Sequence, residues 1–172
     1  MKLLVTLDGS AVSEAILAPA ARLARSMGAE VELFAVGDPH KAHETFARQV
    51  VPESIPAAGP SGAILNVPLP SETMPRTAET REQAIERIED ELRAYLMEKV
   101  HAFEGLTTSV HVEIADHPAE AIIAHARAQG ADMIAMATHG RTGIRHLLAG
   151  SVAEAVIRSG VAPVLALRPE HV

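Results

Sequence analysis

The residues best suited to chemistry in this 172-residue chain form a glycine-rich stretch, ATHGRTGIRHLLAGS, at residues 137–151. Gly140, Gly143 and Gly150 let backbone amides approach an anion closely, and the helix expected after them carries partial positive charge at its N-terminus. Ser151 offers a hydroxyl at that helix start, and two arginines in the stretch offer charge-assisted hydrogen bonds. The pattern is typical of a turn that binds phosphate.

The same stretch also has an ordinary structural interpretation. Its glycines suit left-handed backbone positions in a turn, and Ser151 suits the cap of the following helix. Neither GxxxxGK(S/T) nor GxGxxG occurs in the chain. The spacing of the residues therefore favours neither interpretation over the other.

A carboxylate and a turn end the first apolar run of the chain, in the sequence Asp8-Gly9-Ser10. Asp8 has two interpretations: it contacts a bound ligand, or it caps the next helix and stabilises the turn at Gly9. Taken without any relative, the residues favour the second interpretation, because it needs no ligand.

Histidines and clustered carboxylates raise the question of a metal site or an acid–base pair. The pair His40-x-x-His43 has no obvious third ligand, so solvent-exposed histidines are expected. The carboxylates from Glu82 to Glu91 alternate with arginines, which is typical of a solvated helix face. We expect no metal site and no catalytic residue.

Composition excludes several classes of function. The chain has 15 basic and 22 acidic residues, a formal charge of −7, and no dense run of Lys or Arg, so no nucleic-acid partner is expected. It has no cysteine, which excludes thiol catalysis, disulfides and iron–sulfur clusters. No 18 apolar residues run together and no secretory leader is evident, so we expect no membrane partner and a cytoplasmic location.

Hydrophobic patterning predicts the elements that position these residues. Apolar runs predict buried strands at 3–7, 31–36 and 133–137, and alternation predicts an edge strand at 110–114. A last strand at 161–167 contains Pro163 and is expected at an edge.

Start and stop signals predict four helices. They are one from Ser10 to Gly28 bent at Pro19, one with a capping box at Thr80-x-x-Gln83 that ends at Gly105, one from Pro118 to Gly130, and one with a capping box at Ser151-x-x-Glu154 that ends near Gly160.

Five strands alternating with four helices predict an α/β fold with a five-stranded, parallel, doubly wound sheet and helices on both faces. We expect a single domain over residues 1–172, with a long, irregular, proline-rich insertion at about 39–76 that has room for a short helix at 41–50. Ligands of such sheets bind outside the carboxyl ends of the strands, which directs attention to the turns at 8–10, 36–38, 116–118 and 137–151.

At this point the chain resembles a known family, the universal stress proteins. Their signature is Gly-x-x-Gly, nine residues, then Gly-Ser or Gly-Thr. Ala137-Thr138-His139-Gly140, nine residues and Gly150-Ser151 match it, except that Ala137 replaces the first glycine. The resemblance covers residues 1–38 and 77–168.

The resemblance implies a strand order of 3-2-1-4-5, a homodimer formed through residues 161–167, and an ATP site. Mg²⁺ is expected to accompany ATP, because this metal usually binds phosphate oxygens with few protein ligands. AMP or cAMP is an alternative ligand. Asp8 would lie by the ribose, Val36 by the adenine, and the glycines with Ser151 by the phosphates. The nucleotide-binding residues implied in this way are Asp8, Val36, Ala137, His139, Gly140, Arg141, Gly143, Gly150, Ser151 and Val152.

The expected function is therefore that of an ATP-binding stress-response protein, acting as a homodimeric sensor or regulator. One alternative is the same fold without nucleotide, in which Ala137 blocks the site and the segment 39–76 recruits a partner protein. A second is a weak ATP hydrolase or phosphotransfer protein. For that reaction the chain offers no general base beyond Asp8 or His139 and no Walker lysine, so at most weak ATPase activity is expected.

Overall fold

The computed structural model describes residues 1–40, 55–58, 64–67, 80–138 and 150–169, with the backbone alone at 55–58 and 64–67. Its main sheet consists of β1 (Lys2–Leu7), β2 (Glu30–Gly37), β5 (Thr108–Ile114), β6 (Met133–Ala137) and β7 (Val164–Leu167). The strands pair in parallel in the order β5-β2-β1-β6-β7. Counted along the chain this order is 3-2-1-4-5, so the expected parallel sheet is confirmed.

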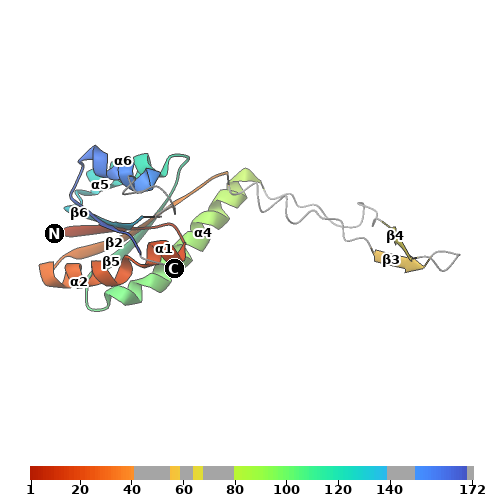
Figure 1. Cartoon of the computed structure of the whole chain (residues 1–172), viewed down its shortest axis with the longest axis horizontal. Helices are drawn as coiled ribbons and strands as arrows, with labels where there is room; N and C mark the ends of the chain where they lie inside the picture. Colours follow the sequence, from red (N-terminus) through yellow and green to blue (C-terminus); the bar gives the residue numbers. More distant parts are fainter. Residues whose placement is uncertain (41–54, 59–63, 68–79, 139–149, 170–172) are drawn as a thin grey trace.

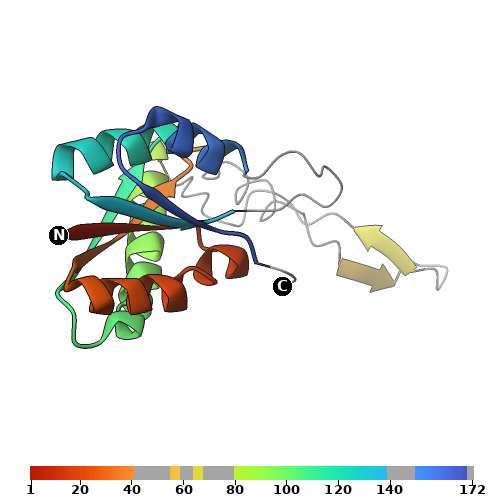
Figure 2. The same cartoon turned by 60° about the vertical axis from the view of Figure 1, so that its left-hand side comes forward.

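Helices cover both faces of this sheet (Figures 1 and 2). One face carries α1 (Ala11–Glu14), α2 (Leu17–Met27) and α4 (Arg81–Lys99), which continues into a short 3-10 helix, η1 (Val100–Phe103). The other face carries α5 (Pro118–Gln129) and α6 (Ser151–Ser159). The sheet is therefore doubly wound, as expected.

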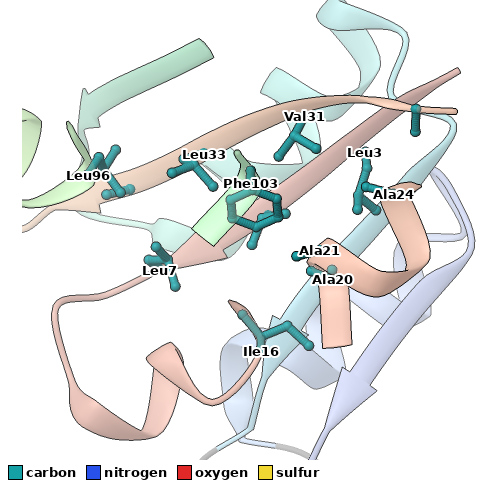
Figure 3. Packing of buried hydrophobic residues seen from close by; sticks show 14 of the residues in the cluster. Leu3, Leu7, Ile16, Ala20, Ala21, Ala24, Val31, Leu33, Leu96 and Phe103 are labelled. Atoms are coloured by element: carbon teal, nitrogen blue, oxygen red, sulfur yellow. The ribbon is translucent and has the colours of Figure 1, made fainter. Parts of the chain in front are cut away.

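Alternate residues of the strands face the two helical layers and form two apolar clusters. Leu3 and Leu7 of β1 pack with α2 and with Phe103 of η1 (Figure 3), whereas Leu4 packs with α5 and α6. Full burial of such a side chain contributes roughly 1.5–3 kcal/mol. Both sides of the sheet are thus fixed by packing, which holds the ends of the strands in place.

Most of the predicted helix ends are confirmed. Thr80 Oγ1 accepts a hydrogen bond from Gln83 N at 3.3 Å and Thr80 N donates to Gln83 Oε1 at 2.8 Å, so the capping box of α4 is complete. Gly28 and Gly130 end α2 and α5 in the left-handed conformation. Among the described helices, none is both long and apolar enough to cross a membrane.

The single bent helix expected from Ser10 to Gly28 is wrong, because two helices, α1 and α2, occupy this segment. Ser10 caps α1 as expected, and Pro19 is the third residue of α2. Proline has no amide hydrogen, so a helix tolerates it in the first turn, where amides lack intrahelical acceptors, and not in the interior. The chain ends one helix before Pro19 and starts another around it.

Both predicted edge strands lie at the ends of the sheet, β5 at one end and β7 at the other. The last strand is shorter than expected, however, since it begins at Val164 and Pro163 precedes it. The carbonyl of Pro163 still accepts a hydrogen bond from Ile134 N at 2.9 Å. The proline therefore sets the start of the strand rather than interrupting it.

The proline-rich insertion is not wholly irregular. Within it, β3 (Ile55–Ala58) pairs antiparallel with β4 (Ile64–Val67), with Ile55 opposite Val67. The short helix considered at 41–50 lies wholly outside the described part of the chain. The expectation of an insertion without regular structure is therefore wrong at 55–58 and 64–67.

Candidate functional site

The candidate site lies at the carboxyl edge of the main sheet, where the strand order reverses between β1 and β6. Thr6 of β1 pairs with Met136 of β6. Asp8 and Thr138 each follow these paired residues by two positions, so the two strands bring them to the same level of the edge. Ligands of doubly wound sheets bind at such a reversal.

A hydrogen-bonded turn holds Asp8 in place at the end of β1. Asp8 Oδ1 accepts from Ser10 N at 2.9 Å and from Ser10 Oγ at 2.6 Å. Ser10 Oγ in turn accepts from Ser13 N at 3.1 Å and so caps α1. The carboxylate therefore stabilises the turn, as one part of the structural interpretation expected, whereas Ser10 rather than Asp8 caps α1. The contact of Asp8 with a ribose stays a prediction.

Ser13 is a residue of this turn that the sequence analysis missed. It is buried, with 4% of its surface exposed. Its hydroxyl accepts from Asp8 N at 3.3 Å and donates to the carbonyl of Ser10 at 2.8 Å. The spacing Ser10-x-x-Ser13, that of an N-cap and the third helical residue, is the signal that could have found it.

Tyr95 of α4 lies beneath this turn and contributes to its electrostatics. Burial raises the pKa of Tyr95 to about 12, and the carboxylates of Glu14 and Asp8 act in the same direction. Lys99 Nζ lies 4.9 Å from the centre of the Tyr95 ring and 3.0 Å from Glu14 Oε1. At neutral pH the phenol is therefore uncharged, and Lys99 offsets the charge of Glu14.

The end of β2 is fixed by close packing. Val36 is half-buried and packs against the cluster on the α5–α6 face. A methyl group built on Gly37 would lie 2.5 Å from Ile114 Cδ1, 2.9 Å from Ile88 Cγ2 and 3.0 Å from Leu92 Cδ1. Only glycine lets α4 and β5 approach this backbone so closely, which fixes the position of Val36.

The end of β6 carries a buried hydroxyl that the sequence analysis did not single out. Thr138 is 2% exposed and its amide donates to the carbonyl of Leu167 at 2.8 Å. Within the described part of the chain, Thr138 Oγ1 has no hydrogen-bond partner. Ala137 beside it is half-buried and packs against the cluster on the α1–α2 face. A threonine directly after an apolar strand was the available signal.

The start of α6 differs from the expected capping box, which is wrong. Gly150 is the N-cap, with φ −60° and ψ 162°, and it has no side chain to cap the helix. Ser151 is already the first helical residue and is exposed, while Val152 is half-buried against the α5–α6 cluster. An N-cap residue has an extended backbone, from which its side chain accepts a hydrogen bond from the amide of the third helical residue. Ser151 has a helical backbone and so cannot make this contact. The first amides of α6 are thus left for another acceptor.

The structure therefore places only part of the predicted site. Asp8, Val36 and Ala137 end or follow neighbouring strands, and Gly150, Ser151 and Val152 open α6. His139, Gly140, Arg141 and Gly143 lie outside the described residues.

Two other predicted surfaces are confirmed as exposed. His40 Nε2 lies 3.1 Å from Asp116 Oδ1, and the His40 side chain is 76% exposed. On α4 the carboxylate of Glu91 pairs with Arg87 at 2.9 Å, as expected for a solvated helix face. His43 lies outside the described residues. The pair of His40 and Asp116 follows the carboxyl ends of β2 and β5, whereas Arg87 and Glu91 lie on α4.

Comparisons with known proteins give a consistent answer. The model of the universal stress protein family matches residues 62–168. Universal stress protein MJ0531 of Methanocaldococcus jannaschii is 42% identical over 60 residues, which cover 34% of this chain and 35% of that protein. Universal stress protein MJ0577 of the same organism is 30% identical over 98 residues, or 52% and 60% of the two chains. The matches thus span less than two thirds of either relative.

Solved structures share the fold at low sequence identity. The structure of MJ0577 superposes with a TM-score of 0.67 at 20% identity and covers 99% of this chain and 97% of that one. A universal stress protein in complex with cAMP gives 0.57 at 17%, with 98% and 96% covered. One from Archaeoglobus fulgidus in complex with dAMP gives 0.53 at 21%, with 96% of each covered. The family match extends over more than half of the chain, and so the chain belongs to the universal stress protein family.

Proposed function

We propose that this chain binds an adenine nucleotide, ATP with Mg²⁺, at the carboxyl edge of its main sheet. The observation that carries the proposal is the start of α6 at Gly150, an N-cap residue that has no side chain to cap the helix. The helix follows β6, and its start lies at the same end of the sheet as the carboxyl end of β1 (Figure 2). Its first amides and partial positive charge are therefore at the edge of the sheet that Asp8 follows. These are the donors that a phosphate group needs.

The residues present fit such a ligand. The orphan hydroxyl of Thr138 adds a buried polar group at the same edge. Ala137, which replaces a glycine of the family signature, packs its methyl group against the apolar cluster on the α1–α2 face. This packing supports binding, because the core accommodates the methyl group. The cAMP and dAMP complexes of two structural relatives support an adenine nucleotide as the ligand.

Each part of the nucleotide has a proposed contact. Asp8 accepts hydrogen bonds from ribose hydroxyls, and the aliphatic side chain of Val36 packs against the adenine. The amides of Ser151 and Val152 donate to phosphate oxygens. His139, Gly140, Arg141 and Gly143 remain proposed phosphate contacts. Mg²⁺ would bridge phosphate oxygens with few protein ligands.

Isothermal titration calorimetry of the full chain with ATP and Mg²⁺, ADP, AMP and cAMP tests this proposal. We expect a Kd for ATP of about 100 µM or tighter, which is roughly −5.5 kcal/mol. Asp8→Ala should weaken binding about tenfold, which corresponds to about 1.4 kcal/mol. Asp90→Ala, an exposed carboxylate on α4, is the matched control.

The proposal fails if none of these nucleotides produces heat and mass spectrometry of the purified protein finds no bound adenine nucleotide. An equal loss of affinity in Asp8→Ala and Asp90→Ala would remove Asp8 from the site. Phosphate release that vanishes in Asp8→Ala would instead favour the weak hydrolase.

The proposal includes a single domain that acts as a homodimeric regulator, with β7 as the dimer edge. β7 ends the sheet and is only four residues long. The amides of Ile134 and Thr138 donate to the carbonyls of Pro163 and Leu167. Every second residue from Pro163 to Leu167 therefore directs its backbone hydrogen-bonding groups toward β6. The amide and carbonyl of Ala166 accordingly face away from β6 and can pair with a second copy. A cytoplasmic location and a role in stress stay predictions.

Light scattering coupled to gel filtration checks the dimer. We expect a dimer for the native chain and a monomer for Ala166→Pro, which removes an outward amide from an edge strand without breaking a bond to β6. The matched control is Ala166→Ser, which keeps the amide of residue 166 and should remain a dimer. A native monomer, or a dimer of Ala166→Pro, overturns this part of the proposal.

A second candidate function is the recruitment of a partner protein through the insertion. The observation in its favour is the β3–β4 pair, in which each strand has one partner within the described sheet and so one further edge for strand addition. Deletion of residues 41–75 should then abolish capture of the partner and leave ATP affinity unchanged. Loss of both would argue against a separate role for the insertion.

A further inference from the structure

A cluster of imidazole and carboxylate groups lies on the α5–α6 face of the sheet, where Glu113 of β5 pairs with Val36 of β2. His111 and Glu113 of β5 and His125 of α5 each offer one potential metal-ligating atom, and these atoms all lie within 4.8 Å of one another. His111 is exposed, Glu113 is half-buried and His125 is 7% exposed. The cluster is therefore anchored in the core and open on one side.

Strand register and helix periodicity bring these residues together. Phe34 of β2 pairs with His111, and residues two apart on a strand face the same side, so His111 and Glu113 share the face of Phe34. His125 belongs to the buried stripe of α5. Its ring stacks on Phe34 with 4.3 Å between ring centres and on His111 with 4.5 Å. The packing of Phe34 thus holds both imidazoles in place.

Buried polar atoms in this cluster lack hydrogen bonds. Glu32 of β2 is 8% exposed, and its Oε1 lies 3.2 Å from His125 Nε2 while its Oε2 lies 3.7 Å from Lys2 Nζ. Among the described residues, neither His125 Nε2 nor Glu32 Oε2 has a hydrogen-bond partner. Buried polar groups without partners destabilise a fold. When the other ring nitrogen of His125 binds an ion, Nε2 carries the proton and faces Glu32 Oε1, 3.2 Å away, so the two buried groups become partners.

We propose that His111, Glu113 and His125 bind a divalent transition-metal ion with the ligand preferences of Zn²⁺. Imidazole and carboxylate are ligands that such ions accept, and three protein ligands leave a position open to water on the exposed side. Glu32 is a positioning residue, because a carboxylate beside a ligating imidazole orients the ring and raises its basicity. Closing the ligand atoms around an ion requires only side-chain rotation, which the exposed His111 permits.

Titration of the full chain, freed of metal with EDTA, tests the site with Zn²⁺ and with Co²⁺, whose visible absorption reports nitrogen coordination. We expect one tightly bound ion per chain. His111→Gln and Glu113→Gln should each weaken binding at least about tenfold, and Glu32→Gln about tenfold. His117→Gln is the matched control, since His117 is exposed and caps α5 without a side-chain hydrogen bond.

Several outcomes would overturn the proposal. One such outcome is that the wild-type chain binds no Zn²⁺. Another is that His111→Gln and His117→Gln lose affinity for Zn²⁺ equally, as expected for ions held by scattered surface histidines. Circular dichroism of each variant shows whether it is folded. His111 is exposed, so its replacement removes a ligand without opening the core, and loss of binding in a folded His111→Gln supports the site directly.

Discussion

The carboxyl edge of the sheet and the cluster of His111, Glu113 and His125 present opposite chemistry on one fold. At the carboxyl edge the described residues offer donors: the first amides of α6, which Gly150 has no side chain to cap, and the hydroxyl of Thr138, which has no partner among these residues. In the cluster the corresponding groups are carboxylate and imidazole groups, with Glu32 at their base. The first arrangement suits an anion and the second suits a cation.

The two regions also differ in how they are built. The turn that carries Asp8 draws its hydrogen bonds from Ser10 and Ser13, residues a few positions away in the chain. The cluster draws on β5 and α5, and its supporting residues Glu32 and Phe34 come from β2, which lies far from both in the sequence. Local hydrogen bonds can make a turn complete on its own, whereas side chains gathered from separate elements can remain unsatisfied until something binds.

The largest effect is expected where the carboxyl edge depends on packing. Gly37→Val should destabilise the fold by about 3 kcal/mol, because its side chain would overlap Ile114 and Ile88 and core overpacking carries costs of that order. Urea unfolding measures the free energy. Ala94→Val, exposed on α4, is the control and should cost only about 0.5 kcal/mol. Equal costs would show that Gly37 is not closely packed.

The second-largest effect is expected from Zn²⁺, whose stabilisation of the fold should depend on the cluster and not on the carboxyl edge. At a free concentration of 100 times its Kd, Zn²⁺ should stabilise the chain by about 2.7 kcal/mol. A domain of this size gains about 2–4 °C in Tm per kcal/mol, so Tm should rise by about 5–10 °C. Asp8→Ala should retain the rise and His111→Gln should lose it, as differential scanning fluorimetry can measure. A rise that depends on Asp8 would contradict two independent sites.

Ser13→Ala tests the other region in the same way. It removes the hydroxyl that joins Asp8 to Ser10, and with it two part-buried hydrogen bonds, at a cost of about 2 kcal/mol in unfolding free energy. Calorimetry should show weaker ATP binding and unchanged Zn²⁺ binding. In Ser26→Ala, which removes an exposed hydroxyl bonded to Leu23, both affinities should stay the same. Unchanged ATP affinity in Ser13→Ala would separate the turn from the site.

The smallest effect is expected from ionisation of Tyr95 beneath the Asp8 turn. Tyr95 is the sole tyrosine and the chain has no tryptophan, so its absorbance titration reports one group. The midpoint should lie at about 12 in the folded chain, against roughly 10 in denaturant. A raised pKa means that the neutral phenol favours the folded state, so this contribution is complete below pH ~10 and is lost as pH rises toward ~12. A native midpoint near that of the denatured chain would mean that Tyr95 is not buried.

The fold could be predicted closely from the residues, with errors at particular places. Thr80 with Gln83 and Gly130 marked helix ends correctly, because capping is a local interaction. Pro19 and Ser151 were placed wrongly. Each lies in the first turn of its helix, and only the backbone conformation decides whether the helix starts before or after such a residue. The candidate site was recognised at Asp8, but Ser13 and Thr138 were missed because their roles depend on burial.

The sequence by itself determined the alternation of strands and helices, the turn at Asp8 and the family signature at 137–151, since all of these depend on residues close together in the chain. The family resemblance implied that β5 lies beside β2, and the tertiary structure alone decided that α5 covers this pair. On the sequence, His111 and Glu113 are the outward half of an edge strand and His125 is one residue of a helix. Packing against Phe34 makes them neighbours, because strand register and helix docking are set by burial across the whole domain.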